Sequence, residues 1–180
     1  MKKSYLYTAG VIAFGLVAVA ALKSCRTIPK GAKAVSPFSS QRYLGKWYEI
    51  ARMDFRFERN LNNTTANYSK NDDGTIRVVN RGYNYKTGEW KQAIGKAKFV
   101  KDTNIAMLKV SFFGPFYSGY NVIALDPGYK YALVAGKNLD YLWILSREKT
   151  IPQEIKTSYL SKAEALGFKT GDLVWVEHTQ

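Results

Sequence analysis

The chain has 180 residues, which is long enough for one domain, and its 13 Tyr, 9 Phe and 4 Trp suit a packed core or an apolar cavity. A formal net charge of +13 favours anionic partners, either lipid surfaces or nucleic acid. A single Cys excludes an intramolecular disulfide, and a single His, His178, argues against a histidine-based metal site. No cofactor is expected.

The first 25 residues have the layout of a lipoprotein signal. A basic start precedes an uncharged run over residues 4–22, and the Leu-Lys-Ser-Cys sequence ending at Cys25 resembles a bacterial lipobox. We therefore expect residues 1–24 to be a signal peptide and Cys25 to be an acylated lipid anchor. Arg26 stands where an Asp would resemble an inner-membrane retention signal, so the resemblance points to the outer membrane. The alternative is an uncleaved anchor, because a spanning helix needs roughly 20 residues.

The rest of the chain changes character near Gly45. Residues 25–39 are rich in Lys, Ala, Ser, Gly and Pro, a composition typical of a tether. From Gly45 on, short aromatic and β-branched runs alternate with turn signals such as Asp-Pro-Gly at 126–128. These runs predict strands near residues 46–54, 64–70, 75–83, 89–100, 105–113, 117–126, 129–136 and 140–147.

Eight short consecutive strands predict an all-β, up-and-down antiparallel barrel, because closure removes the sheet edges. The interior of such a barrel is just wide enough for one small ligand. The pattern alone fits a packed β-sandwich without a cavity about equally well.

One helix is expected after the last barrel strand, packed on the outside of the barrel. Thr150 and Gln153 have the spacing of a capping box, and Pro152 suits a first turn. Gly167 predicts the helix end, and residues 173–176 predict a last short strand. The apolar stripe of the helix consists of Ile155, Tyr159, Ala163 and Leu166.

Three motifs, in order, resemble those of the lipocalin family. Gly45 and Trp47 form a G-x-W sequence on the first strand, and Arg147 ends the last barrel strand. Asp126 and Tyr129 resemble the second motif, T-D-x-x-Y, although a Leu replaces the Thr. Longer stretches are similar to bacterial outer-membrane lipocalins over residues 45–61, 108–126 and 140–147. The resemblance covers a barrel domain over residues 40–178.

The motif residues are expected to meet at the closed end of the barrel, because the first strand starts there, the sixth strand turns there and the eighth strand ends there. There Arg147 can stack on the Trp47 ring and donate to nearby carbonyls, which is a structural role rather than a catalytic one. This predicted closed-end motif consists of Gly45, Trp47, Asp126, Tyr129 and Arg147.

Strand alternation and the family resemblance together predict which side chains line the barrel interior. The predicted cavity wall consists of Ala51, Met53, Ala66, Asn80, Leu108, Val110, Phe112, Tyr120, Val122, Tyr141 and Trp143. Glu49 is the one acid expected well inside. The resemblance implies lysophospholipids and free fatty acids as ligands, and each buried methylene contributes about 0.8 kcal/mol. The small residues either leave space for an acyl chain or accommodate bulky neighbours in a filled core.

The open rim carries basic and aromatic residues. The candidates for binding a phosphate or carboxylate head group are Arg56, Arg59, Lys86 and Lys137. A solvated basic surface attracted to anionic lipid explains them equally well. Phe113, Pro115, Phe116 and Tyr117 either enter a membrane, meet a second subunit in a homodimer, or close the pocket over its ligand.

We therefore expect a lipid-binding protein rather than an enzyme. The only His is near the C-terminus and no G-x-S-x-G motif is present, whereas a serine hydrolase needs a base beside its nucleophile. Nucleic acid is not expected as a partner, because the basic residues are dispersed and the signal directs the chain to export. The predicted role is lipid storage or transport in envelope maintenance, at the outer membrane and facing the periplasm. The alternative is a structural envelope lipoprotein with a filled barrel.

Overall fold

The computed structural model describes residues 27–179, so the predicted signal peptide and Cys25 lie outside the described residues. Within residues 27–179, no helix has both the length and the apolar character needed to cross a bilayer.

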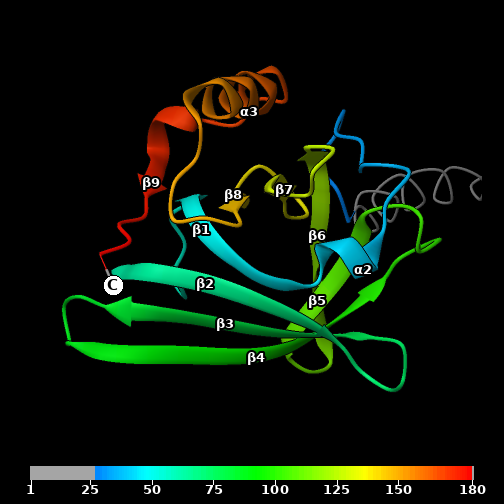
Figure 1. Cartoon of the computed structure of the whole chain (residues 1–180), viewed down its shortest axis with the longest axis horizontal. Helices are drawn as coiled ribbons and strands as arrows, with labels where there is room; N and C mark the ends of the chain where they lie inside the picture. Colours follow the sequence, from blue (N-terminus) through cyan, green and yellow to red (C-terminus); the bar gives the residue numbers. More distant parts are fainter. Residues whose placement is uncertain (1–26, 180) are drawn as a thin grey trace, which may run out of the picture.

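Eight strands close into an antiparallel barrel (Figure 1). They are β1 (Gly45–Met53), β2 (Leu61–Lys70), β3 (Ile76–Asn84), β4 (Glu89–Phe99), β5 (Met107–Phe113), β6 (Phe116–Leu125), β7 (Tyr131–Ala135) and β8 (Leu142–Ser146). Each strand pairs with the next, and β1 closes the ring by pairing with both β8 and β2. A ninth strand, β9 (Leu173–Trp175), pairs with the end of β1. The predicted up-and-down barrel is confirmed.

Side chains in the turns fix where the hairpins reverse. In the β2–β3 turn, the Asp73 carboxylate accepts the backbone N–H of Thr75 at 3.0 Å. In the β3–β4 turn, the Asn84 side-chain oxygen accepts the N–H groups of Lys86 and Thr87 at 3.0 and 3.2 Å. Short polar side chains of this kind stabilise tight turns, and they hold the long β2–β3–β4 ribbon in register.

Helix α3 (Gln153–Ala165) lies outside the barrel, as predicted (Figure 1). Tyr159 and Ala163 are buried against β1, β7 and β8, and the Tyr159 hydroxyl donates to the Tyr131 carbonyl at 2.9 Å. The predicted capping box is wrong: Pro152 is the N-cap and no side chain caps the helix, while Gln153 donates to the Thr157 hydroxyl instead. Packing on the barrel therefore stabilises this helix more than its cap does.

Residues 27–39, expected to be a tether, contain no helix or strand but pack along the barrel. Val35 donates to the Val122 carbonyl and accepts from Ala106, at 2.8 and 2.9 Å. Phe38 is buried in the barrel interior. The helical turn α2 (Ser40–Tyr43) follows and lies across the closed end.

A β-bulge in β1 changes which of its side chains face inward. The register of β1 against β8 shifts between Glu49 and Ala51. Before the bulge, Trp47 and Glu49 face the interior; after it, Arg52 takes the inward position and is 1% exposed. The prediction that Ala51 and Met53 face the interior is wrong, because one extra residue moves every later side chain to the opposite face. Both pack in the cluster between the barrel and α3.

The closed-end motif assembles as predicted around Arg147. Its guanidinium carbon lies 3.9 Å from the centroid of the buried Trp47 ring. Its nitrogens donate to five backbone carbonyls, those of Arg42, Tyr43, Leu44, Lys46 and Tyr129, at 2.8–3.2 Å.

The other members of the motif shape the turns beside Arg147. Asp126 accepts three backbone N–H groups of the β6–β7 turn at 2.6–2.8 Å. Tyr129 adopts a left-handed φ of 58° and its hydroxyl accepts the Ser39 N–H. Gly45 has φ of +93°, a conformation that favours glycine, so the chain can turn close to Arg147.

Candidate functional site

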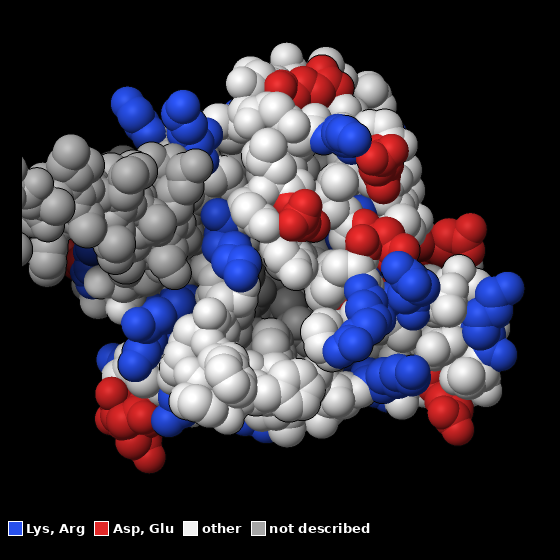
Figure 2. Space-filling model, turned by 180° about the vertical axis from the view of Figure 1, so that it is seen from behind, with Lys and Arg blue, Asp and Glu red and all other residues white. Residues whose placement is uncertain are grey.

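A cavity of about 520 Å³ occupies the barrel interior. This volume falls within the roughly 300–1,000 Å³ typical of small-molecule sites. The face shown in Figure 2 is hollowed near its centre, with Lys and Arg side chains on both sides of the hollow. The alternative of a filled barrel is therefore wrong, and the expected cavity is present.

The cavity wall agrees with most of the interior residues predicted from alternation. Those that line it are Ala66, Asn80, Leu108, Val110, Phe112, Tyr120, Tyr141 and Trp143. Val122 is fully buried in the interior core but does not line the cavity, because the segment around Val35 and Ala106 pairs with its backbone near the closed end. Ala51 and Met53 do not line it because of the bulge.

Three tyrosines lie at the inner end of the cavity. The hydroxyl of Tyr120 on β6 makes hydrogen bonds of 2.8 Å with the hydroxyls of Tyr43 on α2 and Tyr68 on β2. Burial raises the pKa of all three phenols, so they stay neutral. Their hydroxyl groups satisfy one another, and the rings present an apolar floor to the cavity.

The opposite side of the cavity is polar and centres on Arg52. Its Nη1 donates to the Glu49 carboxylate at 2.7 Å, and its Nη2 donates to the carbonyls of Glu58 and Leu61 at 2.7 and 3.1 Å. Trp143 Nε1 on β8 donates to the Glu58 carboxylate at 3.0 Å. The Arg52 and Glu58 contacts hold the β1–β2 loop against the barrel wall.

Burial raises the pKa of both carboxyls on this side. For Glu49 the pKa reaches about 8, because desolvation and the nearby Glu58 outweigh the stabilising contact with Arg52. Burial also raises the pKa of Glu58, against the opposing effect of the Trp143 hydrogen bond. The pair therefore holds a proton near neutral pH, which suits a wall built mainly of apolar side chains.

Exposed aromatic side chains surround the mouth. Phe113 and Phe116 are 67% and 79% exposed, and Phe57 lies 6.1 Å from Phe113 between ring centroids. With Tyr117, all of these residues line the cavity. Large exposed apolar side chains grouped at an opening are typical of contact with lipid or with another protein.

The four basic residues predicted to meet a head group lie outside the cavity wall. The guanidinium of Arg56 stacks on the Phe57 ring, Arg59 pairs with Asp54 at 3.3 Å, and Lys86 lies over Tyr85. Lys137 does not line the cavity either. Lys91 on β4 does line it, opposite Gly82 of β3, and was not predicted.

Sequence reasoning also missed Arg52, Glu58 and Thr64. Arg52 falls on the outward face in simple alternation, and only the bulge turns it inward. Glu58 belongs to a loop, for which periodicity assigns no face. The spacing of Glu49 and Arg52, three residues apart, was the one available signal for a buried pair.

The fold and its interior cavity define a barrel carrier of small hydrophobic ligands rather than an enzyme. Residues 38–178 match the family model of the lipocalin-like domain. The chain therefore belongs to the lipocalin family, and the resemblance found in its motifs is confirmed.

Relatives cover nearly all of the chain. It is 52% identical to outer membrane lipoprotein Blc of Escherichia coli strain K12 over 177 residues, which is 98% of each chain. It is 35% identical to temperature-induced lipocalin-1 of Arabidopsis thaliana, over 82% of this chain and 83% of that one. Among solved structures, insecticyanin from the tobacco hornworm Manduca sexta superposes with a TM-score of 0.68 at 19% identity, covering 86% of this chain and 88% of that one.

Proposed function

We propose that this lipocalin is an outer-membrane lipoprotein that binds single-chain lipids, lysophospholipids and free fatty acids, for storage or transport in envelope maintenance. The observation that carries the proposal is the cavity of about 520 Å³, whose wall is mostly apolar and whose inner end is a neutral tyrosine floor. In this proposal the acyl chain points to the floor and the head group lies near the mouth.

The energetics favour a hydrocarbon ligand. Each methylene moved from water to this wall contributes about 0.8 kcal/mol, so a long acyl chain gains on the order of 10 kcal/mol before the costs of association. A structural lipoprotein with a filled barrel is disfavoured by the cavity itself. A hydrolase is disfavoured because His178 lies at the C-terminal tail, where its Nε2 contacts the Glu49 carbonyl at 2.7 Å.

We also propose that Cys25 carries the lipid anchor and that the protein faces the periplasm. Relatives named outer membrane lipoproteins support this location. Thr27 contacts the barrel near the mouth: its carbonyl accepts from Asn121 at 2.6 Å and lies beside Gly119 and the Lys137 backbone. Because Cys25 precedes Thr27 by two residues, at most ~7 Å of chain separates them. A lipid on Cys25 would thus hold the mouth, with its exposed aromatic residues, near the membrane.

Native mass spectrometry of the protein extracted from its own membrane tests both proposals together. We expect a chain that begins at an acylated Cys25 and that retains a single-chain lipid of hundreds of daltons. A Cys25→Ser chain should be recovered without the acyl mass. A full-length, unacylated wild-type chain would overturn the anchor, and release of no lipid under any mild extraction would contradict the carrier role.

A cavity-blocking variant tests where the lipid binds. Ala97 lines the cavity, so Ala97→Phe should reduce lipid uptake at least tenfold. Ala165 is exposed on α3, and Ala165→Phe is the matched control that should bind as wild type does. Equal uptake by both variants would place the ligand elsewhere.

A further inference from the structure

The tip of the β5–β6 hairpin carries apolar side chains that remain largely exposed to water. Phe113 ends β5, Phe116 begins β6, and these two are the most exposed large apolar side chains of residues 27–179. They are cross-strand partners, and the Phe57 ring lies 6.1 Å from that of Phe113, so the three rings form one exposed group at the mouth. Water solvates such a group poorly, and the tip therefore favours an apolar partner.

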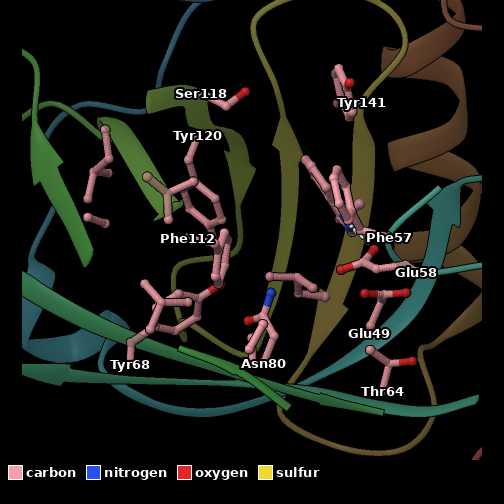
Figure 3. Close-up of a pocket in the computed structure, with 18 of the residues that line it drawn as sticks. Glu49, Phe57, Glu58, Thr64, Tyr68, Asn80, Phe112, Ser118, Tyr120 and Tyr141 are labelled. Carbon is pink, nitrogen blue, oxygen red and sulfur yellow. Dashed lines mark hydrogen bonds between the residues drawn. The ribbon is translucent and has the colours of Figure 1, made fainter. Parts of the chain in front are cut away.

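The start of the described chain lies against the outer face of this hairpin. Figure 3 shows Ser118 of β6 pointing into the cavity, so its neighbours Tyr117 and Gly119 face outward. The Thr27 carbonyl lies so close to Gly119 that a Cβ would not fit between them. Cys25 precedes Thr27 by two residues, which is at most ~7 Å of chain. An acyl group on Cys25 would therefore emerge beside the outer face of the hairpin.

Two lysines meet at the Tyr117 ring on this outer face. Lys98 of β4 and Lys109 of β5 are direct cross-strand partners. Their Nζ atoms lie 4.8 and 5.5 Å from the centroid of the Tyr117 ring. Neither lysine forms an ion pair with any of residues 27–179. Like charges directly opposite one another destabilise a sheet, so this pair favours an anionic partner from outside the fold.

The hairpin surface, which we define as Phe113, Phe116, Tyr117, Lys98 and Lys109, has the order of polarity of a membrane interface. The rings at its tip suit hydrocarbon, whereas Tyr and Lys suit the level of the head groups, where their polar ends stay in water. Four residues of strand span about 13 Å, so Lys109 lies about that far from Phe113 along β5. Amphipathic surface elements enter a bilayer by about 5–10 Å, and at that depth of the tip the lysines reach the phosphates.

We propose that the hairpin surface is a second membrane-contact site, which binds an anionic phospholipid bilayer and holds the cavity mouth at the level of the head groups. The inference rests on the proposed lipid anchor, which emerges beside this surface. A lipid then passes between the bilayer and the cavity without crossing water. A second copy of the chain fits less well, because a protein with 27 Lys and Arg against 14 Asp and Glu would repel the lysine pair.

Nitroxide spin labels measure how deep single sites lie in a bilayer. The acylated chain is extracted from its own membrane and reconstituted in vesicles of three parts phosphatidylcholine to one part phosphatidylglycerol. Gly114→Cys places a label at the hairpin tip, and Gly171→Cys, just before β9 and across the barrel, is the matched control. A Cβ at either glycine meets nothing within 4 Å. Both variants should bind the uncharged fluorescent probe N-phenyl-1-naphthylamine in the cavity as wild type does, which checks that they fold.

We expect the label at the hairpin tip to collide with oxygen, relative to a water-soluble nickel complex, about threefold more than the control label does, because oxygen concentrates in hydrocarbon. Lys98→Gln together with Lys109→Gln should lower this ratio to the value found in vesicles of phosphatidylcholine alone. Lys149→Gln together with Lys162→Gln removes the same charge at exposed positions elsewhere and should leave the ratio unchanged.

Equal collision ratios for the two labels would overturn the inference, as would a ratio that ignores both the lysine pair and the anionic lipid. Magnetic coupling between the tip labels of two chains would assign the hairpin surface to a second copy instead. Wild type should take up no label, because its only Cys is acylated. Uptake would contradict the proposed anchor alone, and the depth of the tip would then be measured on a Cys25→Ser background.

Discussion

Replacing Arg147 by Ala should lower the free energy of unfolding by about 3–5 kcal/mol. Five backbone carbonyls of the closed end accept hydrogen bonds from this one guanidinium, which also covers the Trp47 ring. A hydrogen bond to a charged group contributes about 1.5–3 kcal/mol, and stacking on an aromatic face about 0.5–1 kcal/mol. The five bonds share one half-buried cation and water can replace several of them, so the total is far below their sum.

Urea unfolding followed by circular dichroism measures this loss. Arg77→Ala, at an exposed position on β3, is the matched control and should change stability by less than about 0.5 kcal/mol. Arg147→Lys keeps the charge but not the planar fork, so it should recover less than half of the loss. If Arg147→Ala costs under 1 kcal/mol, or if Lys restores full stability, the closed end is not held by the geometry of this side chain.

Three further predictions concern the interior and the helix. The Glu49 pKa is raised from 4.5 to about 8, so between these pH values the folded chain keeps a proton that the unfolded chain releases. The free energy of unfolding should therefore fall by up to about 1.4 kcal/mol per pH unit between pH 4.5 and 8, and then level off. Urea titrations at pH 5, 6.5 and 8 should show this slope in wild type and a smaller one in Glu49→Gln; identical slopes would contradict the assignment. Tyr120→Phe removes the hydroxyl that pairs with both other floor tyrosines, and should cost about 1–2 kcal/mol in the same assay, whereas no loss would mean that the hydroxyls are satisfied otherwise. Ala163→Leu overpacks the contact between α3 and the barrel and should cost about 1–3 kcal/mol while probe binding in the cavity stays unchanged; weakened probe binding would show that the two cores are coupled.

The strands and the closed end were predictable because both depend on local sequence. Alternating runs between turn residues locate strands, and Gly45, Trp47 and Arg147 act through neighbours that strand order brings together. The helix was predictable for the same reason, although its capping box was not formed. Local pattern thus predicted the strands and the outer helix, while the family resemblance decided for a closed barrel over a sandwich and identified the motif of the closed end.

The polar side of the cavity was not predictable, because it depends on events that periodicity does not encode. The bulge after Glu49 reverses the facing of Ala51, Arg52 and Met53, and no residue type marks that position. Glu58 reaches the cavity from a loop, through a long-range hydrogen bond to Trp143. Such contacts depend on tertiary geometry, which explains why the predicted wall contained apolar residues almost alone.

The polar side of the cavity, with Glu49, Arg52 and Glu58, follows from the way in which the barrel is closed between β1 and β2. Pairing of these strands stops at Tyr48 and Thr65, and above that point β9 takes the place of β2 beside β1. The C-terminal tail continues along the gap, where Asn63 donates to the Glu177 carbonyl. In the gap, Arg52 donates to the backbone carbonyl of Glu58, in the β1–β2 loop, and to that of Leu61, the first residue of β2.

A buried guanidinium needs a counter-charge, which the Glu49 and Glu58 carboxyls supply together because the pair holds one proton near neutral pH; Glu49, three residues earlier on the same strand, makes the direct contact. Glu49 in the cavity wall is thus the partner of Arg52, whose hydrogen bonds replace the missing backbone pairing between β1 and β2. Its presence there does not depend on ligand binding alone. Arg52→Met should therefore both loosen the β1–β2 loop and leave Glu49 without its cation. Glu49 and Arg52 can be lost together at lower cost than either alone, which a double-mutant cycle of Glu49→Gln and Arg52→Met measures directly. Strictly additive losses would show that the two side chains act separately, and the link between barrel closure and the polar side of the cavity would fail.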